Sequence, residues 1–135
     1  MKVGLTYNLR KDYIHKPDDP PDADAELDFE GTIKSLTETL QSLGHIVIDI
    51  SGNGNNILYS LQSKEACLPP VDIIFNISEG FYGRSREAQI PAILEMLQIP
   101  YIGSDPLTLA VSLDKAVAKT IVAYSGIPTP KFFKI

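Results

Sequence analysis

The chain has 135 residues, and its 12 basic and 17 acidic side chains give a net charge of −5. This length suits one compact domain, or one domain with a piece of another, and an acidic chain argues against nucleic acid as the partner. Seven acidic and no basic side chains lie within residues 17–30, which leaves 12 − 10 = +2 elsewhere. The acidity therefore belongs to one segment and not to the whole surface.

The chain contains one cysteine, so it has no intramolecular disulfide. Cys67 is expected to be a small, partly buried apolar residue. The sequence has no run of about 18 apolar residues, and its first residues turn polar too early for a signal peptide. These features predict a reducing, cytoplasmic setting with no membrane partner.

Four segments rich in apolar and β-branched residues predict β-strands. Three span residues 2–7, 45–50 and 71–76, and a short fourth is expected at residues 100–103. Their apolar runs are nearly continuous and do not alternate with polar residues. This pattern favours strands covered on both faces, as in a parallel sheet.

Helical patterns fill the intervals between these strands. In the first interval, five apolar residues recur at a spacing that places them on one helix face: Phe29, Ile33, Leu36, Leu40 and Leu43. Gly44 follows them, at the position where a left-handed residue commonly ends a helix. A short helix is expected at residues 56–64, and another at residues 90–97, where Pro91 is tolerated in the first turn.

Two further helices are expected towards the end of the sequence. Asp105 is a candidate N-cap, and Pro106 occupies the first helical position after it. Ser112 is the candidate cap of the last helix, which ends at Gly126. Residues 131–135 alternate like a strand that begins and is cut off. The predicted order, β-α-β-α-β-α-β-α-α, is typical of an α/β fold with an open, mainly parallel sheet and helices on both faces.

One loop stands out as a candidate ligand site. Residues 76–87 follow the third predicted strand, and ligands of open α/β sheets bind at the carboxyl ends of strands. Arg84 and Arg86 suit the recognition of a carboxylate or a phosphate. In the alternative interpretation, they pair with Glu79 or Glu87 on a solvated loop.

Other motifs are weaker. The Gly/Asn-rich residues 51–56 lack the third glycine of a dinucleotide-binding loop and are expected to form a flexible turn. Lys115 and Lys119 share a helix face and are either solvated or phosphate-binding. His15 and His45 have no partners at metal-ligand spacing, so the sequence predicts no metal site.

From residue 76 onward the sequence resembles the D-alanine–D-alanine ligase group of the ATP-grasp superfamily, and before it the resemblance is looser. Three motifs carry the resemblance: Ile-Pro-Tyr-Ile-Gly-Ser at residues 99–104, Ser-Leu-Asp-Lys at residues 112–115 with Lys119 after it, and Gly-Ile-Pro-Thr-Pro at residues 126–130. Each motif alone is weak, but they occur in the family's order and at close spacing.

The resemblance implies a fold, an organisation and an activity. Residues 1–103 would form a Rossmann-like pre-ATP-grasp domain, and residues 104–135 would be the helical lead and first strand of an ATP-grasp domain. The implied reaction uses ATP and Mg²⁺ to phosphorylate a carboxylate, which an amine then attacks, as in peptidoglycan biosynthesis. The 135-residue chain would be inactive alone, with its magnesium ligands beyond Ile135. By resemblance only, a homodimer is also expected.

The resemblance also assigns candidate site residues. Lys115 matches the lysine that meets the phosphates of the nucleotide. Glu79 and Gly80 stand where the family usually has His-Gly, close to its first amino-acid substrate, and Arg84 belongs to the loop that follows. Glu26 is the nearest candidate for the glutamate that binds the substrate ammonium, with Asp28 second; both could instead be solvated acids before a helix.

Two departures from the family motif leave the substrate open. Glu79 replaces the usual histidine, and the loop after it is about two residues longer. Tyr-Asn-Leu-Arg at residues 7–10 replaces a glycine pair, and the acidic segment replaces a short loop. The alternatives are an ATP-grasp ligase for another carboxylate and amine, or a Rossmann-like binding module without catalysis.

Overall fold

The computed structural model describes residues 1–50 and 71–133. The predicted turn at residues 51–56, the helix at residues 56–64 and Cys67 lie outside the described residues. The elements in chain order are β1 (Lys2–Thr6), η1 (Arg10–Asp12), α1 (Glu30–Ser42), β2 (Ile46–Asp49), β3 (Ile73–Asn76), η2 (Arg86–Ala88), α3 (Gln89–Met96), β4 (Tyr101–Ile102), α4 (Pro106–Leu113) and α5 (Lys115–Tyr124).

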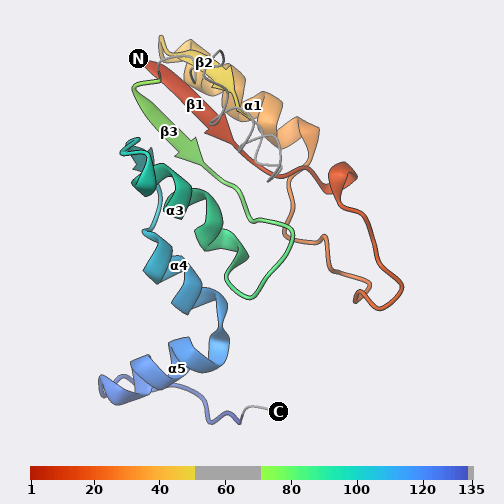
Figure 1. Cartoon of the computed structure of the whole chain (residues 1–135), viewed down its shortest axis with the longest axis vertical. Helices are drawn as coiled ribbons and strands as arrows, with labels where there is room; N and C mark the ends of the chain where they lie inside the picture. The colour runs from red at the N-terminus through yellow and green to blue at the C-terminus, as the bar shows by residue number, and fades with distance from the viewer. Residues whose placement is uncertain (51–70, 134–135) are drawn as a thin grey trace.

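The four strands form one parallel sheet in the order β2-β1-β3-β4, and Figure 1 shows β1 between β2 and β3. β1 is central, and its Val3 pairs with Val47 of β2 and with Ile73 of β3. The chain moves from β1 to β2 in one direction across the sheet and from β3 to β4 in the other. Because such crossovers are right-handed, α1 and α3 cover opposite faces. The predicted α/β class and parallel sheet are confirmed.

The core lies between the sheet and α3. Ile50 and Ile74 are buried against Ile90 and Leu94 of α3. Pro91 is buried in the first turn of this helix, as predicted. α1 is less covered: Ile33, Leu36 and Leu40 are half-buried, whereas Phe29 and Leu43, which flank the helix, are exposed.

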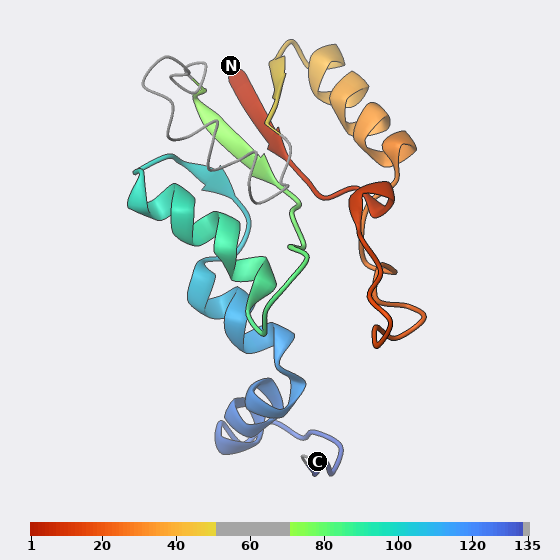
Figure 2. The same ribbon diagram turned by 45° about the vertical axis from the view of Figure 1, so that its right-hand side comes forward.

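α4 and α5 continue from the α3 side and lead away from the sheet (Figure 2). Asp105 caps α4, as predicted, and accepts a 3.0 Å hydrogen bond from the amide of Thr108. The prediction for the second cap was wrong. Ser112 lies inside α4, and Asp114 caps α5 because its carboxylate accepts from the amides of two first-turn residues, Ala116 and Val117.

The strand expected from residue 131 is absent over residues 131–133. Phe132 instead packs beside α5, where it lines a cavity with Ala116, Thr120 and Ile121, and the ammonium of Lys119 lies 5.4 Å from its ring centroid. An alternating pattern becomes a strand only where a neighbouring strand accepts its backbone hydrogen bonds. Among the described helices, none has both the length and the apolar character needed to cross a membrane.

Candidate functional site

The candidate site lies where the chain leaves β1 and β3. These two strands are neighbours, but their connections run to opposite sides of the sheet. In open α/β sheets, the crevice at such a switch point, outside the carboxyl ends of the strands, is where ligands bind. Asn8 follows β1, and Glu79 and Gly80 follow β3, so the fold brings the predicted loop to this crevice.

Buried polar side chains fix the two loops at this crevice. The hydroxyl of Thr6 donates to the side-chain oxygen of Asn76 at 2.7 Å, and the amide of Ser78 donates to the same oxygen at 3.3 Å. The amide of Gly80 donates to the side-chain oxygen of Asn8 at 2.8 Å, and Asn8 is only 1% exposed. Buried polar groups with such partners rigidify a site.

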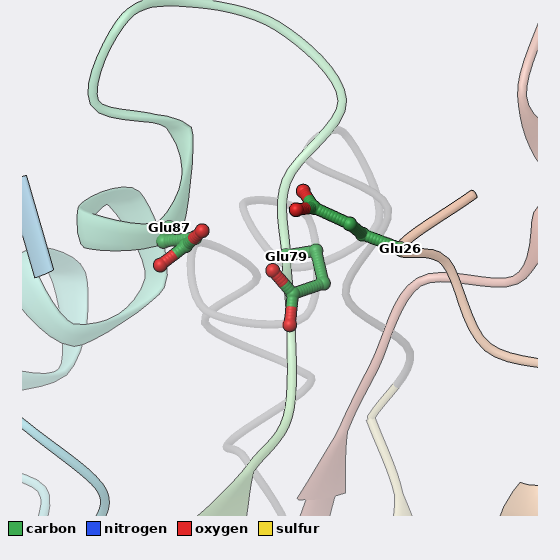
Figure 3. A group of neighbouring side chains, drawn as sticks. All are labelled: Glu26, Glu79 and Glu87. Atoms are coloured by element: carbon green, nitrogen blue, oxygen red, sulfur yellow. The ribbon is translucent and has the colours of Figure 1, made fainter. Parts of the chain in front are cut away.

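Three carboxylates converge beside these loops. Glu26 precedes α1, Glu79 follows β3 and Glu87 lies in η2, and one oxygen of each falls within 4.8 Å of the others. In Figure 3 the carboxyl groups of Glu26 and Glu87 approach that of Glu79 from opposite sides. We call these three residues the carboxylate cluster. Its position predicts recognition of a cation.

The carboxylate cluster perturbs the protonation of its central member. Burial, followed by the negative charges of Glu87 and Glu26, raises the pKa of Glu79 to about 7, and the positive charge of Arg86 acts in the opposite direction. A carboxyl group with a pKa near neutrality, set by burial and named neighbours, marks a candidate functional site.

Arg86 is the cation next to the carboxylate cluster. Its guanidinium forms an ion pair with the carboxylate of Glu26. Its backbone lies against Gly80, where a Cβ atom would come within 2.6 Å of the carbonyl oxygen of Arg86. Gly80 also has φ +70°, a conformation that suits glycine. The loop is therefore folded back tightly on itself between Glu79 and Arg86.

The acidic segment folds into a defined loop at the site. Asp24 is buried and accepts from Arg10 through two hydrogen bonds of 2.7 and 3.0 Å. The Arg10 hydrogen bonds are the first cause of the lowered pKa of the Asp24 carboxyl, and a hydrogen bond from His15 acts in the same direction. The amide of Asp28 donates to the carbonyl of Asn8 at 3.0 Å, which ties the segment to the end of β1.

Aromatic side chains join the residues just before the acidic segment to the loop after β3, and the hydroxyl of Tyr13 donates to Asp19 of that segment at 2.9 Å. The ring of Tyr13 lies 5.9 Å from that of Phe81 and 6.1 Å from that of Tyr82, measured between centroids. The ammonium of Lys16 lies 4.4 Å from the centroid of Tyr82, within the range of a cation–π contact. Tyr13 and Lys16 thus pack against the loop after β3.

The structure separates the two arginines of the predicted loop. Arg86 is in the site, paired with Glu26 and not with Glu79 or Glu87 as in the solvated alternative. Arg84 instead binds Asp114, the cap of α5, with its Nε 2.8 Å from the carboxylate.

The remaining predicted residues lie further along the chain or in the segment before α1. Lys115 is exposed at the start of α5, and its Nζ donates to the carbonyl of Ser112 at 3.2 Å. Asp28, the second ammonium candidate, is not one of the three clustered carboxylates and pairs through its backbone with Leu9.

Sequence reasoning missed Asn8 as a support of the site and Glu87 as a member of the carboxylate cluster. Glu26 and Glu87 lie far apart in the sequence, so no local sequence pattern predicts that their carboxylates meet.

A groove of about 520 Å³ lies beside α1, and Lys11, Glu30 and Lys34 help to line it. It shares no residue with the carboxylate cluster.

Comparisons with known proteins point to one group. No protein-family model matches the chain. A D-alanine–D-alanine ligase from Moorella thermoacetica is 32% identical over 112 residues, which cover 83% of this chain and 33% of the relative. One from Pelotomaculum thermopropionicum is 43% identical over 65 residues, covering 48% and 20%. The uncharacterized protein y4sG of Sinorhizobium fredii is 36% identical over 104 residues, covering 73% and 30%.

The fold comparison agrees with the sequence comparison. The crystal structure of D-alanine–D-alanine ligase from Bacillus anthracis superposes with a TM-score of 0.64 at 22% identity, over 97% of this chain and 37% of that chain. The same enzyme complexed with ATP gives a TM-score of 0.63. The chain spans 20–33% of the length of the curated relatives described above. The chain is therefore similar in sequence to D-alanine–D-alanine ligases and similar in fold to one of them, and it spans only 20–37% of the length of these proteins.

Proposed function

We propose that the chain is the substrate-side part of a longer ATP-dependent ligase, which joins a carboxylate to an amine through an acyl phosphate. The relatives named D-alanine–D-alanine ligase support the reaction class. The single observation that carries the proposal is the carboxylate cluster, which meets at the switch point of the sheet where such folds bind ligands.

In this proposal the carboxylate cluster binds the ammonium group of an amino-acid substrate. An ammonium group offers three hydrogen-bond donors, and hydrogen bonds between charged partners are stronger than neutral ones. Glu79 and Glu87 accept these bonds, while Arg86 holds Glu26. The turn at Gly80 sets the direction of Glu79. Arg84 acts outside this group, because Asp114 engages its guanidinium.

The nucleotide is assigned to the other end of the chain. Residues 104–135 would begin the ATP-grasp domain, with the domain boundary at residues 103 and 104. The exposed Nζ of Lys115 is free to turn from the Ser112 carbonyl towards a phosphate. Magnesium would neutralise charge on the transferred phosphoryl group, and we place its ligands in a part of the longer protein outside this chain.

The carboxylate cluster also favours a second candidate, a ligase for a carboxylate and amine other than two D-alanine molecules. The family's histidine is replaced here by Glu79, whose neighbours are two further carboxylates and one guanidinium. This charge distribution differs from that of a neutral imidazole. The chemistry of the reaction stays the same, and only the identity of the joined molecules changes.

ADP release from the protein encoded by the whole reading frame tests the function. With a panel of amino acids, we expect ADP formation that depends on both a carboxylate and an amine, and none from the 135-residue chain alone. If D-alanine is clearly the best substrate, the second candidate is excluded. A stop codon soon after Ile135, or no ADP with any pair, would contradict the proposal and leave a binding module without catalysis.

A further inference from the structure

The guanidinium of Arg84 joins the loop after β3 to the start of α5. Its Nε donates to one carboxylate oxygen of Asp114 at 2.8 Å, and a terminal nitrogen of the guanidinium donates to the same oxygen. The other carboxylate oxygen accepts from the amides of Ala116 and Val117 at 3.1 and 3.0 Å. The Asp114 side chain, which is 14% exposed, therefore holds both the arginine and the first turn of the helix.

The direction of α5 depends on Asp114. This residue alone separates Leu113, the last residue of α4, from Lys115, the first residue of α5. Its backbone is extended, with φ −83° and ψ 97°, and α5 turns away from the line of α4 at this point (Figure 1). Because Lys115 follows directly, a contact that fixes Asp114 also fixes the point from which the Lys115 side chain starts.

Two contacts that span Arg84 fix the loop that carries it. The backbone at Gly80 lies so close to Arg86 that a Cβ atom would come within 2.6 Å of its carbonyl oxygen, and the side-chain amide of Gln89 donates to the carbonyl of Tyr82 at 2.8 Å. The Arg84 side chain is 67% exposed, and exposed ion pairs add little to stability. The contact with the cap of α5 is therefore better suited to orienting this helix than to stabilising the fold.

We propose that Arg84 is a positioning residue for nucleotide binding: through Asp114 it holds the first turn of α5, and with it Lys115, in a fixed place relative to the loop after β3. Arg84 acts through the cap of the helix and itself contacts neither substrate. The role of Lys115 at a phosphate rests on the proposed function, whereas the contact between Arg84 and Asp114 is a feature of the fold.

Calorimetric titration of the protein encoded by the whole reading frame with adenylyl imidodiphosphate, a non-hydrolysable ATP analogue, and Mg²⁺ tests the inference without catalysis. Arg84→Gln should weaken binding of the analogue roughly three- to fivefold, the range open to an exposed ion pair. Asp114→Asn should weaken it equally, because asparagine caps a helix as well as aspartate does but lacks the charge that holds Arg84. Lys34→Gln, which removes an exposed cation paired with Glu38 on α1, should bind the analogue like wild type.

The double variant Arg84→Gln/Asp114→Asn tests whether both substitutions act through one contact. It should bind the analogue no more weakly than either single variant, with the number of sites unchanged, because loss of the fold would lower the number of sites and not the affinity of those that remain. Additive losses, or wild-type affinity in either single variant, would overturn the inference, and Asp114→Asn decides it if Arg84→Gln fails to fold. No binding of the analogue by wild type would instead refute the proposed function, and the inference would fall with it.

Discussion

The amide of Gly80 donates a 2.8 Å hydrogen bond to the side chain of Asn8, which lies 72 residues earlier in the sequence. This bond joins the loop after β1 to the loop after β3. Because Asn8 also accepts from the amide of Asp28 through its backbone carbonyl, it connects three segments of the site. Glu79 and Glu26 are each close in sequence to one of these hydrogen-bonded residues.

Replacing Asn8 should destabilise the protein. Asn8→Ala leaves the part-buried amide of Gly80 without its acceptor, and such a loss costs about 1–3 kcal/mol of unfolding free energy. Urea denaturation followed by circular dichroism measures the change. Ser42→Ala is the control, since Ser42 makes an exposed hydrogen bond on α1 and its loss should cost less than about 0.5 kcal/mol. Equal stability of the two variants would refute the structural role of Asn8.

Two glycines with similar backbone angles should respond differently to alanine. Gly44 has φ +84° and open space at its Cβ position, whereas Gly80 has φ +70° and the carbonyl oxygen of Arg86 within 2.6 Å. Gly44→Ala should lower the free energy of unfolding by about 1–2 kcal/mol, the cost of a left-handed conformation for alanine. Gly80→Ala adds a clash with the Arg86 carbonyl, so it should lower the free energy of unfolding by more. Urea denaturation measures both changes. A smaller loss for Gly80→Ala would contradict the tight turn at Arg86.

Local features of the fold were predictable because they depend on neighbouring residues. Apolar β-branched runs predicted strands to within about two residues of β1, β2 and β3, and Gly44 was identified as a left-handed helix end. The boundary between α4 and α5 was missed because serine and aspartate both cap helices, and only the structure shows that Asp114 reaches the amides. The expected strand at residue 131 failed because alternation does not reveal whether a partner strand exists.

The candidate site was predictable only in part. Glu79 and Gly80 were identified because they follow the third predicted strand and match a motif of the family that the sequence resembles. Glu26 was chosen from several acidic residues in one segment. Glu26 and Arg86 are 60 residues apart in the sequence, and they meet only because the fold brings the segment before α1 beside the loop after β3. No spacing in the sequence encodes that contact, so the partners of Arg84 and Arg86 could not be assigned.

Stability should depend on the protonation of Glu79. Burial and the neighbouring Glu87 and Glu26 raise its pKa from 4.5 to about 7 in the folded state. Between these values the folded state holds a proton that the unfolded state has lost, so stability falls as pH rises. The stability of Glu79→Gln should lack this pH dependence, because glutamine does not titrate. The free energy of unfolding of wild type minus that of Glu79→Gln, measured from pH 4 to pH 8, should therefore decline between the two pKa values and level off at higher pH. A difference that does not change with pH would contradict the raised pKa.

The cap of α5 gives a further test. Asp114 accepts from the amides of Ala116 and Val117 and pairs with Arg84. Asp114→Ala should therefore cost about 0.5–2 kcal/mol of stability. Ser112→Ala is the matched comparison, because the Ser112 hydroxyl donates only to the Leu109 carbonyl within α4. Thermal unfolding measures the stability of both variants, and Asp114→Ala should be the less stable. A larger loss of stability in Ser112→Ala would instead indicate that Ser112 caps the last helix, as expected from the sequence.

The central claim, that the carboxylate cluster binds the substrate's ammonium group, is tested most directly by the KM for the amino acid in ADP release from the protein encoded by the whole reading frame. Glu79→Gln keeps the shape of the side chain and removes its charge. Exchange of a charge-assisted hydrogen bond, about 1.5–3 kcal/mol, for a neutral one, about 0.5–1.5 kcal/mol, predicts a KM raised roughly five- to tenfold, with the KM for ATP unchanged. Glu38→Gln, on the exposed side of α1, should leave both values as in wild type. An unchanged amino-acid KM in Glu79→Gln would contradict the claim.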